Sequence, residues 1–100
     1  MKKTINGVRY DSRKAIKIGG MQNHQPGDFE YCDETLYATP RSGRFFLHGR
    51  GGPGSRWAKT IDGDLKEGEG VLPLSRSSAR EWAEHHLAVD LDIDLKEKEI

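Results

Sequence analysis

The segment 34–57 limits the possible folds more than any other part of the chain, because it combines dense aromatic and aliphatic content with dense glycine content. Two short runs of β-type residues, 36–39 and 44–48, flank the sequence PRSG, whose residues are typical of turns. A glycine-rich run over 49–55 follows directly. The pattern predicts a β-hairpin that leads into a loop and forms the centre of a small antiparallel sheet.

Shorter strands are expected on both sides of this hairpin. Asn6-Gly7 lies between two β-type pieces and predicts a type I′ turn, since both central residues of that turn need positive φ. Residues 11–18 fit either a polar turn followed by a strand or one helical turn with Asp11 or Ser12 as its cap. We expect further strands at 29–33, 56–61 and 71–74, and an exposed turn region at 62–70. Pro73 confines the last of these strands to a sheet edge or places the proline at a strand end.

One helix is predicted near the C-terminus, with Ser75 as its N-cap. Its apolar positions follow helical spacing and would face the sheet. They are Ala79, Trp82, Ala83, His86 and Leu87. On the sheet, Phe45 and Leu47, or their neighbours Leu36 and Tyr37, would face this helix through Trp82.

The expected fold class is therefore α+β, with an antiparallel sheet of about 4–6 strands packed against one C-terminal helix. Residues 1–88 would form this single domain. Residues 89–100 would form an acidic C-terminal tail or an edge strand.

Length and composition allow one small core. The chain has 100 residues, of which 34% are hydrophobic and 32% charged, so a second core is out of reach. No apolar run approaches the roughly 20 residues of a membrane span, and residues 1–20 contain no apolar block of a secretory signal. The single Cys32 argues against a disulfide framework. We therefore expect a cytoplasmic protein without membrane contact.

The formal net charge is zero, but the charges are divided along the chain. Residues 1–60 contain 11 Lys/Arg and 5 Asp/Glu, whereas residues 61–100 contain 5 Lys/Arg and 11 Asp/Glu. This division predicts one basic and one acidic surface, each available to a partner, unless folding interleaves the two halves.

The acidic candidates lie in the C-terminal part of the chain. Asp90, Asp92 and Asp94 alternate with apolar residues, so an extended segment would present their carboxylates about 6.6 Å apart on one face. Such a strip could imitate nucleic-acid phosphates, together with Glu81 and Glu84 of the helix, or could add a strand to a partner's sheet. The alternatives are a last edge strand with a solvated face, or a frayed acidic terminus.

The basic candidates surround the glycine-rich run. The sequence GRGGPG over 49–54 satisfies the G-x-G-x-x-G pattern, but its flanks predict strands, and a dinucleotide site needs a helix that begins at the glycines. Close approach of the glycine backbone together with positive charge fits a nucleic-acid backbone or an acidic protein instead. The alternative is a plain exposed loop. The candidate side chains are Arg41, Arg44, Arg50, Arg56 and Lys59.

No group of residues predicts a reaction. Cys32 has no base that the sequence assigns to it, and the histidines at 24, 48, 85 and 86 lack metal-site spacing. The run Asp90-x-Asp92-x-Asp94 lacks the glycine of a calcium loop. We therefore expect no enzyme activity, no cofactor and no metal.

Three segments carry a resemblance to a known kind of protein. They are INGVRYDS, DETLYATPRSGRFFLHGRGGPGSRWA and VLPLSRSSAREWAEHH, within residues 4–87. They resemble a family of small, largely uncharacterised accessory proteins of phages, plasmids and integrative elements, some similar to anti-CRISPR proteins. The chain departs from the family's pattern at Ser78, where an acidic residue is common, and in its aspartate-rich tail.

The resemblance implies a non-catalytic inhibitor in the cytoplasm of a host cell, which binds a CRISPR effector complex and blocks its access to DNA. Such complexes hold nucleic acid in positively charged channels, to which the acidic residues are complementary. Two alternatives stand beside it. The first is a nucleic-acid-binding module that uses the loop 41–59, and the second is a structural or regulatory protein with another host target.

Overall fold

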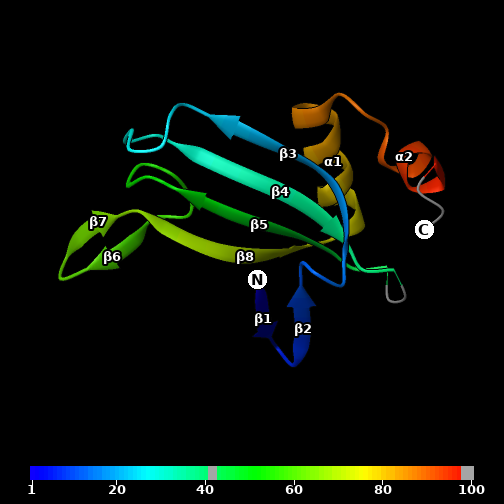
Figure 1. The fold of residues 1–100 in the computed structure, drawn as a ribbon, viewed down its shortest axis with the longest axis horizontal. Helices are drawn as coiled ribbons and strands as arrows, with labels where there is room; N and C mark the ends of the chain where they lie inside the picture. The colour runs from blue at the N-terminus through cyan, green and yellow to red at the C-terminus, as the bar shows by residue number, and fades with distance from the viewer. Residues whose placement is uncertain (41–42, 98–100) are drawn as a thin grey trace.

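The computed structural model describes residues 1–40 and 43–97 and confirms the α+β class (Figure 1). A four-stranded antiparallel sheet has the order β3-β4-β5-β8. Its strands are β3 (Ile16–Asn23), β4 (Cys32–Ala38), β5 (Phe45–Gly51) and β8 (Gly68–Leu74). The other described elements are the hairpins β1 (Lys2–Ile5) with β2 (Val8–Asp11) and β6 (Lys59–Ile61) with β7 (Asp64–Lys66), and the helices α1 (Arg76–Leu87) and α2 (Leu91–Glu97). Figure 1 places β6 and β7 at one end of the sheet and both helices at the other.

The predicted central hairpin is confirmed. Strands β4 and β5 pair with Leu36 opposite Leu47 and Ala38 opposite Phe45. The backbone N–H of Thr39 donates to the carbonyl of Arg44 at 2.9 Å and closes the turn. Pro73 lies in β8, which is an edge strand as predicted, a position that tolerates proline because such a strand pairs on one side only.

The turn at Asn6-Gly7 is also confirmed, with φ values of 50° and 79°. It joins β1 to β2, which pair with Lys3 opposite Tyr10. Residues 16–18 belong to β3, so the strand prediction for this part of the chain is correct and the helical alternative is wrong.

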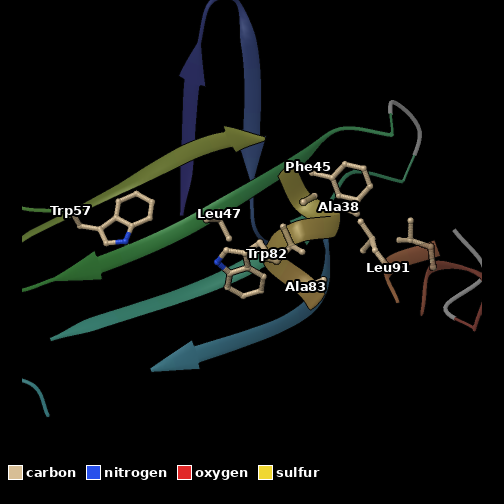
Figure 2. Close-up of a cluster of buried hydrophobic side chains, with 10 residues drawn as sticks. Ala38, Phe45, Leu47, Trp57, Trp82, Ala83 and Leu91 are labelled. Atoms are coloured by element: carbon tan, nitrogen blue, oxygen red, sulfur yellow. The ribbon is translucent and has the colours of Figure 1, made fainter. Parts of the chain in front are cut away.

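The core lies between the sheet and α1. The predicted helical stripe is confirmed, since Ala79, Trp82 and Ala83 are buried against Leu36 and Leu47 (Figure 2). His86 and Leu87, at the end of the stripe, are half-buried. Ser75 caps the helix, because its hydroxyl accepts a hydrogen bond from the backbone N–H of Ser78 at 3.1 Å. Full burial of each large side chain in this core stabilises the fold by about 1.5–3 kcal/mol.

Three predicted segments differ from the structure. The strand expected over 29–33 begins only at Cys32, and Phe29 is 62% exposed in the preceding loop. The strand expected over 56–61 contains only Lys59–Ile61. The turn region expected over 62–70 contributes β7 and the start of β8, because a two-residue turn at Asp62-Gly63, both with positive φ, folds this segment back on β6.

The extended acidic segment predicted from Val89 onward is wrong, because Leu91–Glu97 form a helix. Leu91 and Leu95 are four residues apart, so both fall on one helical face, where they are buried against the core. Asp90 caps this helix through its Oδ1, which accepts from the backbone N–H of Asp92 at 2.9 Å. An alternating pattern of only a few residues is compatible with a strand and with a helix. Burial of Leu91 and Leu95 on one side favours the helix.

Neither of the two described helices covers the opposite face of the sheet, and we call it the open face. Its side chains alternate with those of the core along the strands. Those of β4, β5 and β8 are Asp33, Thr35, Tyr37, Phe46, His48, Arg50, Glu69, Val71 and Pro73. At one end, Tyr10 of β2 contacts Phe46 edge-on, with ring centroids 5.3 Å apart, and Tyr37 stacks on Phe46 at 5.2 Å. The β1–β2 hairpin therefore covers one end of this face and leaves the other end uncovered.

Candidate functional site

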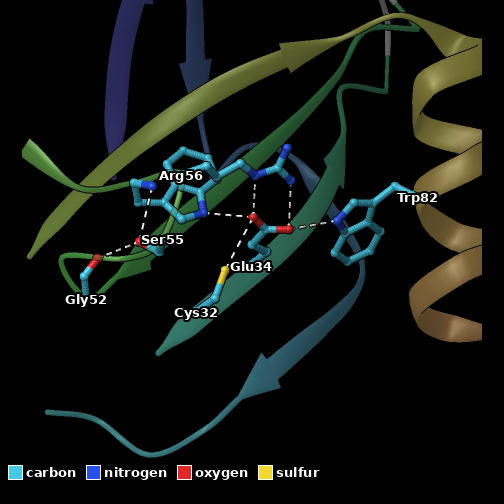
Figure 3. Close-up of polar contacts among 7 residues, drawn as sticks. Cys32, Glu34, Gly52, Ser55, Arg56 and Trp82 are labelled. Carbon is cyan, nitrogen blue, oxygen red and sulfur yellow. Dashed lines mark hydrogen bonds and ion pairs between the residues drawn. The ribbon is translucent and has the colours of Figure 1, made fainter. Parts of the chain in front are cut away.

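The most buried charged side chain is the carboxylate of Glu34, which is 2% exposed on the helix side of β4. Arg56 binds it with two hydrogen bonds, from Nε to Oε2 at 2.6 Å and from Nη2 to Oε1 at 2.8 Å. The indole N–H of Trp57 donates to Oε2 at 2.8 Å, and that of Trp82 donates to Oε1 at 2.9 Å. Figure 3 shows this carboxylate cage, in which four N–H donors from three residues meet at Glu34.

The cage fixes the charge state of Glu34. Burial by itself raises the pKa of this carboxyl group, but the hydrogen bonds from Arg56, Trp82 and Trp57 outweigh burial and lower the pKa to about 2. The same ion pair raises the pKa of Arg56. A group that stays ionised at all ordinary pH values is a poor general acid or base, so the cage is built for structure.

The only cysteine lies beside the cage. Burial raises the pKa of Cys32 to about 11, and the charge of Glu34, whose Oε2 lies 3.5 Å from Sγ, acts in the same direction. A cavity of about 450 Å³ opens over Cys32 and Trp82, and His86 on its wall has a pKa lowered by burial. A thiol held in its protonated form is the opposite of an activated nucleophile.

The glycines of the run 49–55 pack closely against neighbouring parts of the chain. They do not form an open loop that could hold a phosphate group. A Cβ at Gly49 would overlap the indole ring of Trp57, and a Cβ at Gly54 would overlap the ring of Phe29. The N–H groups of Gly52 and Gly54 both donate at 2.8 Å, to the carbonyls of Tyr31 and Phe29. These glycines are therefore explained by close packing against Trp57 and the loop before β4.

We expect the substitution Gly49→Ala to lower the free energy of unfolding by about 1–3 kcal/mol, because the new methyl group displaces the Trp57 ring. Gly70→Ala is a matched control, since a Cβ there lies 3.5 Å from the same ring, at ordinary contact distance. Urea unfolding followed by tryptophan fluorescence measures both. Equal losses for the two variants would contradict the expectation.

The structure does not bring the predicted basic residues together. Arg44 is exposed just before β5, Arg50 lies near the far end of β5 on the open face, and Lys59 begins β6. Arg56 belongs to the carboxylate cage. Arg41 lies outside the described residues.

The predicted acidic residues also have separate roles. Glu81 and Glu84 are exposed on α1. Asp90 caps α2, and Asp92 forms ion pairs with Arg76 at 2.5 Å and Arg80 at 3.0 Å. Hydrogen bonding to Arg76 lowers the pKa of Asp92. Asp94 is half-buried in α2, so the three aspartates do not form a strip with the spacing of phosphates.

A group of charged side chains lies on the open face, and of its members the sequence had indicated only Arg50. Asp33, Arg50 and Glu69 are register partners and form a row across β4, β5 and β8. Thr35, His48 and Val71 form the next row. The alternation of the central hairpin could have identified the members of β4 and β5, because register partners face the same way.

These rows contain linked charges and two shallow hollows. Arg50 lies 3.6 Å from the carboxylate of Asp33, and His48 Nε2 lies 2.8 Å from Glu69 Oε2. One hollow, of about 240 Å³, is lined by both pairs. The other, of about 460 Å³, extends from His48 and Glu69 to Met1, Lys2 and Lys3 of the N-terminal hairpin.

Exposed cations lie on that hairpin and in the segment that follows it. We call them the basic hairpin surface, which consists of Lys2, Lys3, Arg9, Arg13, Lys14 and Lys17. Asp11 is the one acidic residue among residues 1–27, and its carboxylate accepts from the backbone N–H of Arg13 at 3.0 Å. That hydrogen bond, followed by the charges of Arg13, Lys14 and Lys2, lowers the pKa of Asp11, which indicates that these cations lie close to one another.

Comparison with protein-family models, curated proteins and solved structures found no match to this chain. Among the described residues, no helix is both long enough and apolar enough to cross a membrane.

Proposed function

We propose that this protein is a non-catalytic module that binds a charged macromolecular partner through the open face of its sheet. The observation that carries the proposal is the uncovered row Asp33, Arg50 and Glu69, which continues into the hollow beside Lys2 and Lys3. Linked charges of both signs on a rigid sheet favour recognition by electrostatic complementarity.

The shape and chemistry of the molecule support binding rather than turnover. The two hollows share His48 and Glu69 and form one extended surface, which fits a macromolecule better than an enclosed small molecule. The most buried carboxylate is occupied by its four donors, and the pKa of Cys32 is raised to about 11. These two groups are thus held in states that do not suit acid–base or nucleophilic chemistry.

The anti-CRISPR role stays a prediction from resemblance. The phosphate-imitating strip that would have supported it is absent, because Asp90 caps α2 and Asp92 binds two arginines. Inhibition of an effector complex through the open face is compatible with the present proposal, which does not depend on it.

Capture from a bacterial extract tests the proposal. The immobilised protein is compared with Arg50→Glu on the open face and with Lys66→Glu on the exposed β7 strand, which makes the same charge change elsewhere. We expect Arg50→Glu to lose the partner that the original protein retains, and Lys66→Glu to keep it. The partner should bind at a fixed molar ratio, and mass spectrometry should find it chemically unaltered. Equal retention by both variants, or a cleaved or modified partner, would overturn the proposal.

A further inference from the structure

We propose that the basic hairpin surface, with the adjoining part of the open face, binds the phosphate backbone of a nucleic acid. This inference rests on the proposed function and names the class of its partner. It differs from the sequence-based alternative, which placed nucleic-acid binding in the loop 41–59.

Positive charge is dense on the basic hairpin surface. Six Lys/Arg occur within the first 17 residues, all six are exposed, and Asp11 is the single carboxylate among them. The charges are therefore concentrated in space as well as in sequence, although the whole chain has zero formal net charge. Phosphate backbones are bound by such clusters through release of condensed counterions.

The cations are held on a rigid support. Tyr10 is buried and packs on Phe46, and the backbone N–H of Ser12 donates to the carbonyl of Met1 at 3.0 Å. These contacts fix the base of the hairpin, where Lys2 pairs with Asp11 and Lys3 with Tyr10. A preorganised set of cations loses less conformational entropy on binding than a flexible tail does.

The hollows on the sheet adjoin the lysines of this surface. Lys2, Lys3 and His48 line one hollow, and His48 and Arg50 line the next. The carboxylates in these hollows, Glu69 and Asp33, are paired with His48 and Arg50. A phosphate backbone lying along the hairpin side of the hollows thus meets Lys2 and Lys3, while Glu69 and Asp33 are each held by a partner side chain.

The absence of an apolar anchor favours nucleic acid over an acidic protein. Protein–protein interfaces centre on buried aromatic or aliphatic anchors, whereas nucleic-acid interfaces are more polar and strongly positive. The large apolar side chains that are exposed among the described residues are Phe29, Ile61, Leu65 and Ile93. None of the four belongs to β1, β2 or the hollows.

Fluorescence anisotropy with labelled single-stranded DNA, single-stranded RNA and duplex DNA tests the inference. We expect binding whose affinity falls by about 100-fold between about 50 and 200 mM salt, the dependence for about four phosphate contacts. Arg13→Gln with Lys14→Gln should weaken binding by about 10-fold at the lower salt and reduce the salt slope by about 2.

Lys59→Gln with Lys66→Gln is the matched control, because it removes two exposed cations from the β6–β7 hairpin at the other end of the sheet. We expect this variant to bind like the original protein, with circular dichroism confirming that both variants are folded. Failure to bind all three probes at low salt, or equal losses for the two variants, would overturn the inference. Capture of an unaltered protein after nuclease treatment, with no probe bound, would also overturn it but would leave the proposed binding function in place.

Discussion

Replacing Glu34 with alanine is expected to lower the free energy of unfolding by about 3–5 kcal/mol, as for other broken buried ion pairs. The substitution leaves the indole N–H groups of Trp57 and Trp82 without their acceptor and the Arg56 guanidinium without its counter-charge. Unpaired buried donors are costly because water does not replace the lost partner. Urea unfolding, followed by the fluorescence of these two tryptophans, gives the loss directly.

Glu69→Ala is the control for this measurement. It removes a carboxylate of the same type from the open face, where Glu69 is exposed and pairs with His48, so the expected loss is below about 1 kcal/mol. A double-mutant cycle with Arg56→Ala should show that the two cage substitutions together cost less than the sum of the single ones, since each removes the same ion pair. Additive losses, or a loss at Glu34 no larger than at Glu69, would contradict the structural role of the cage.

Acidification is expected to destabilise the protein between about pH 5 and pH 2. The pKa of Glu34 is about 2 in the folded protein and 4.5 in the absence of the cage, so over this range the unfolded chain binds more protons than the folded one. The contribution of the cage is fully present above pH 4.5 and is lost as the pH falls through the folded pKa. The total loss is about 3 kcal/mol, from about 1.4 kcal/mol for each pKa unit.

Urea unfolding at a series of pH values measures this dependence. Glu34→Gln should remove most of the slope of the free energy of unfolding against pH, since it removes the carboxyl group that titrates. Asp92→Asn should leave most of the slope, because the Asp92 side chain is 44% exposed and its pairs with Arg76 and Arg80 are solvated. A slope that survives Glu34→Gln unchanged would show that another group dominates the acid sensitivity.

The parts of the fold that were predictable depend on residues close together in sequence. The turn at Asn6-Gly7, the cap at Ser75 and the stripe through Trp82 are each set by neighbours within a few residues. The alternation in β4 and β5 likewise follows from local pattern. These local rules were sufficient for the α+β class and the central hairpin.

The carboxylate cage could not be predicted in this way. The partners of Glu34 lie 22, 23 and 48 residues further along the chain, and no periodic signal connects them. One clue was present, since Glu34 alternates with Cys32, Leu36 and Ala38 on the inward side of β4 and a buried carboxylate needs a partner. The position of Arg56 beside the glycine-rich run suggested a contact with a partner. Its charge instead pairs with Glu34 inside the fold.

The helix α2 shows a different limit. Seven residues are too few to form a stable helix alone, so contact with the core decides the conformation. The sequence contains both a period-two alternation and the pair Leu91 and Leu95, and only the packing surface distinguishes them. The basic hairpin surface was missed because its cations are spread over β1, β2, the following turn and β3.

The carboxylate cage also affects how the protein folds. Its donors come from the segment between β5 and β6 and from α1, so a partly folded state containing only β4 and β5 keeps the Glu34 carboxylate hydrated. Docking of α1 then has to bring Trp82 to the same oxygen atoms that Arg56 and Trp57 enclose. The cage therefore couples docking of α1 to closure of the core, and a sheet without its helix would expose the apolar side that α1 covers.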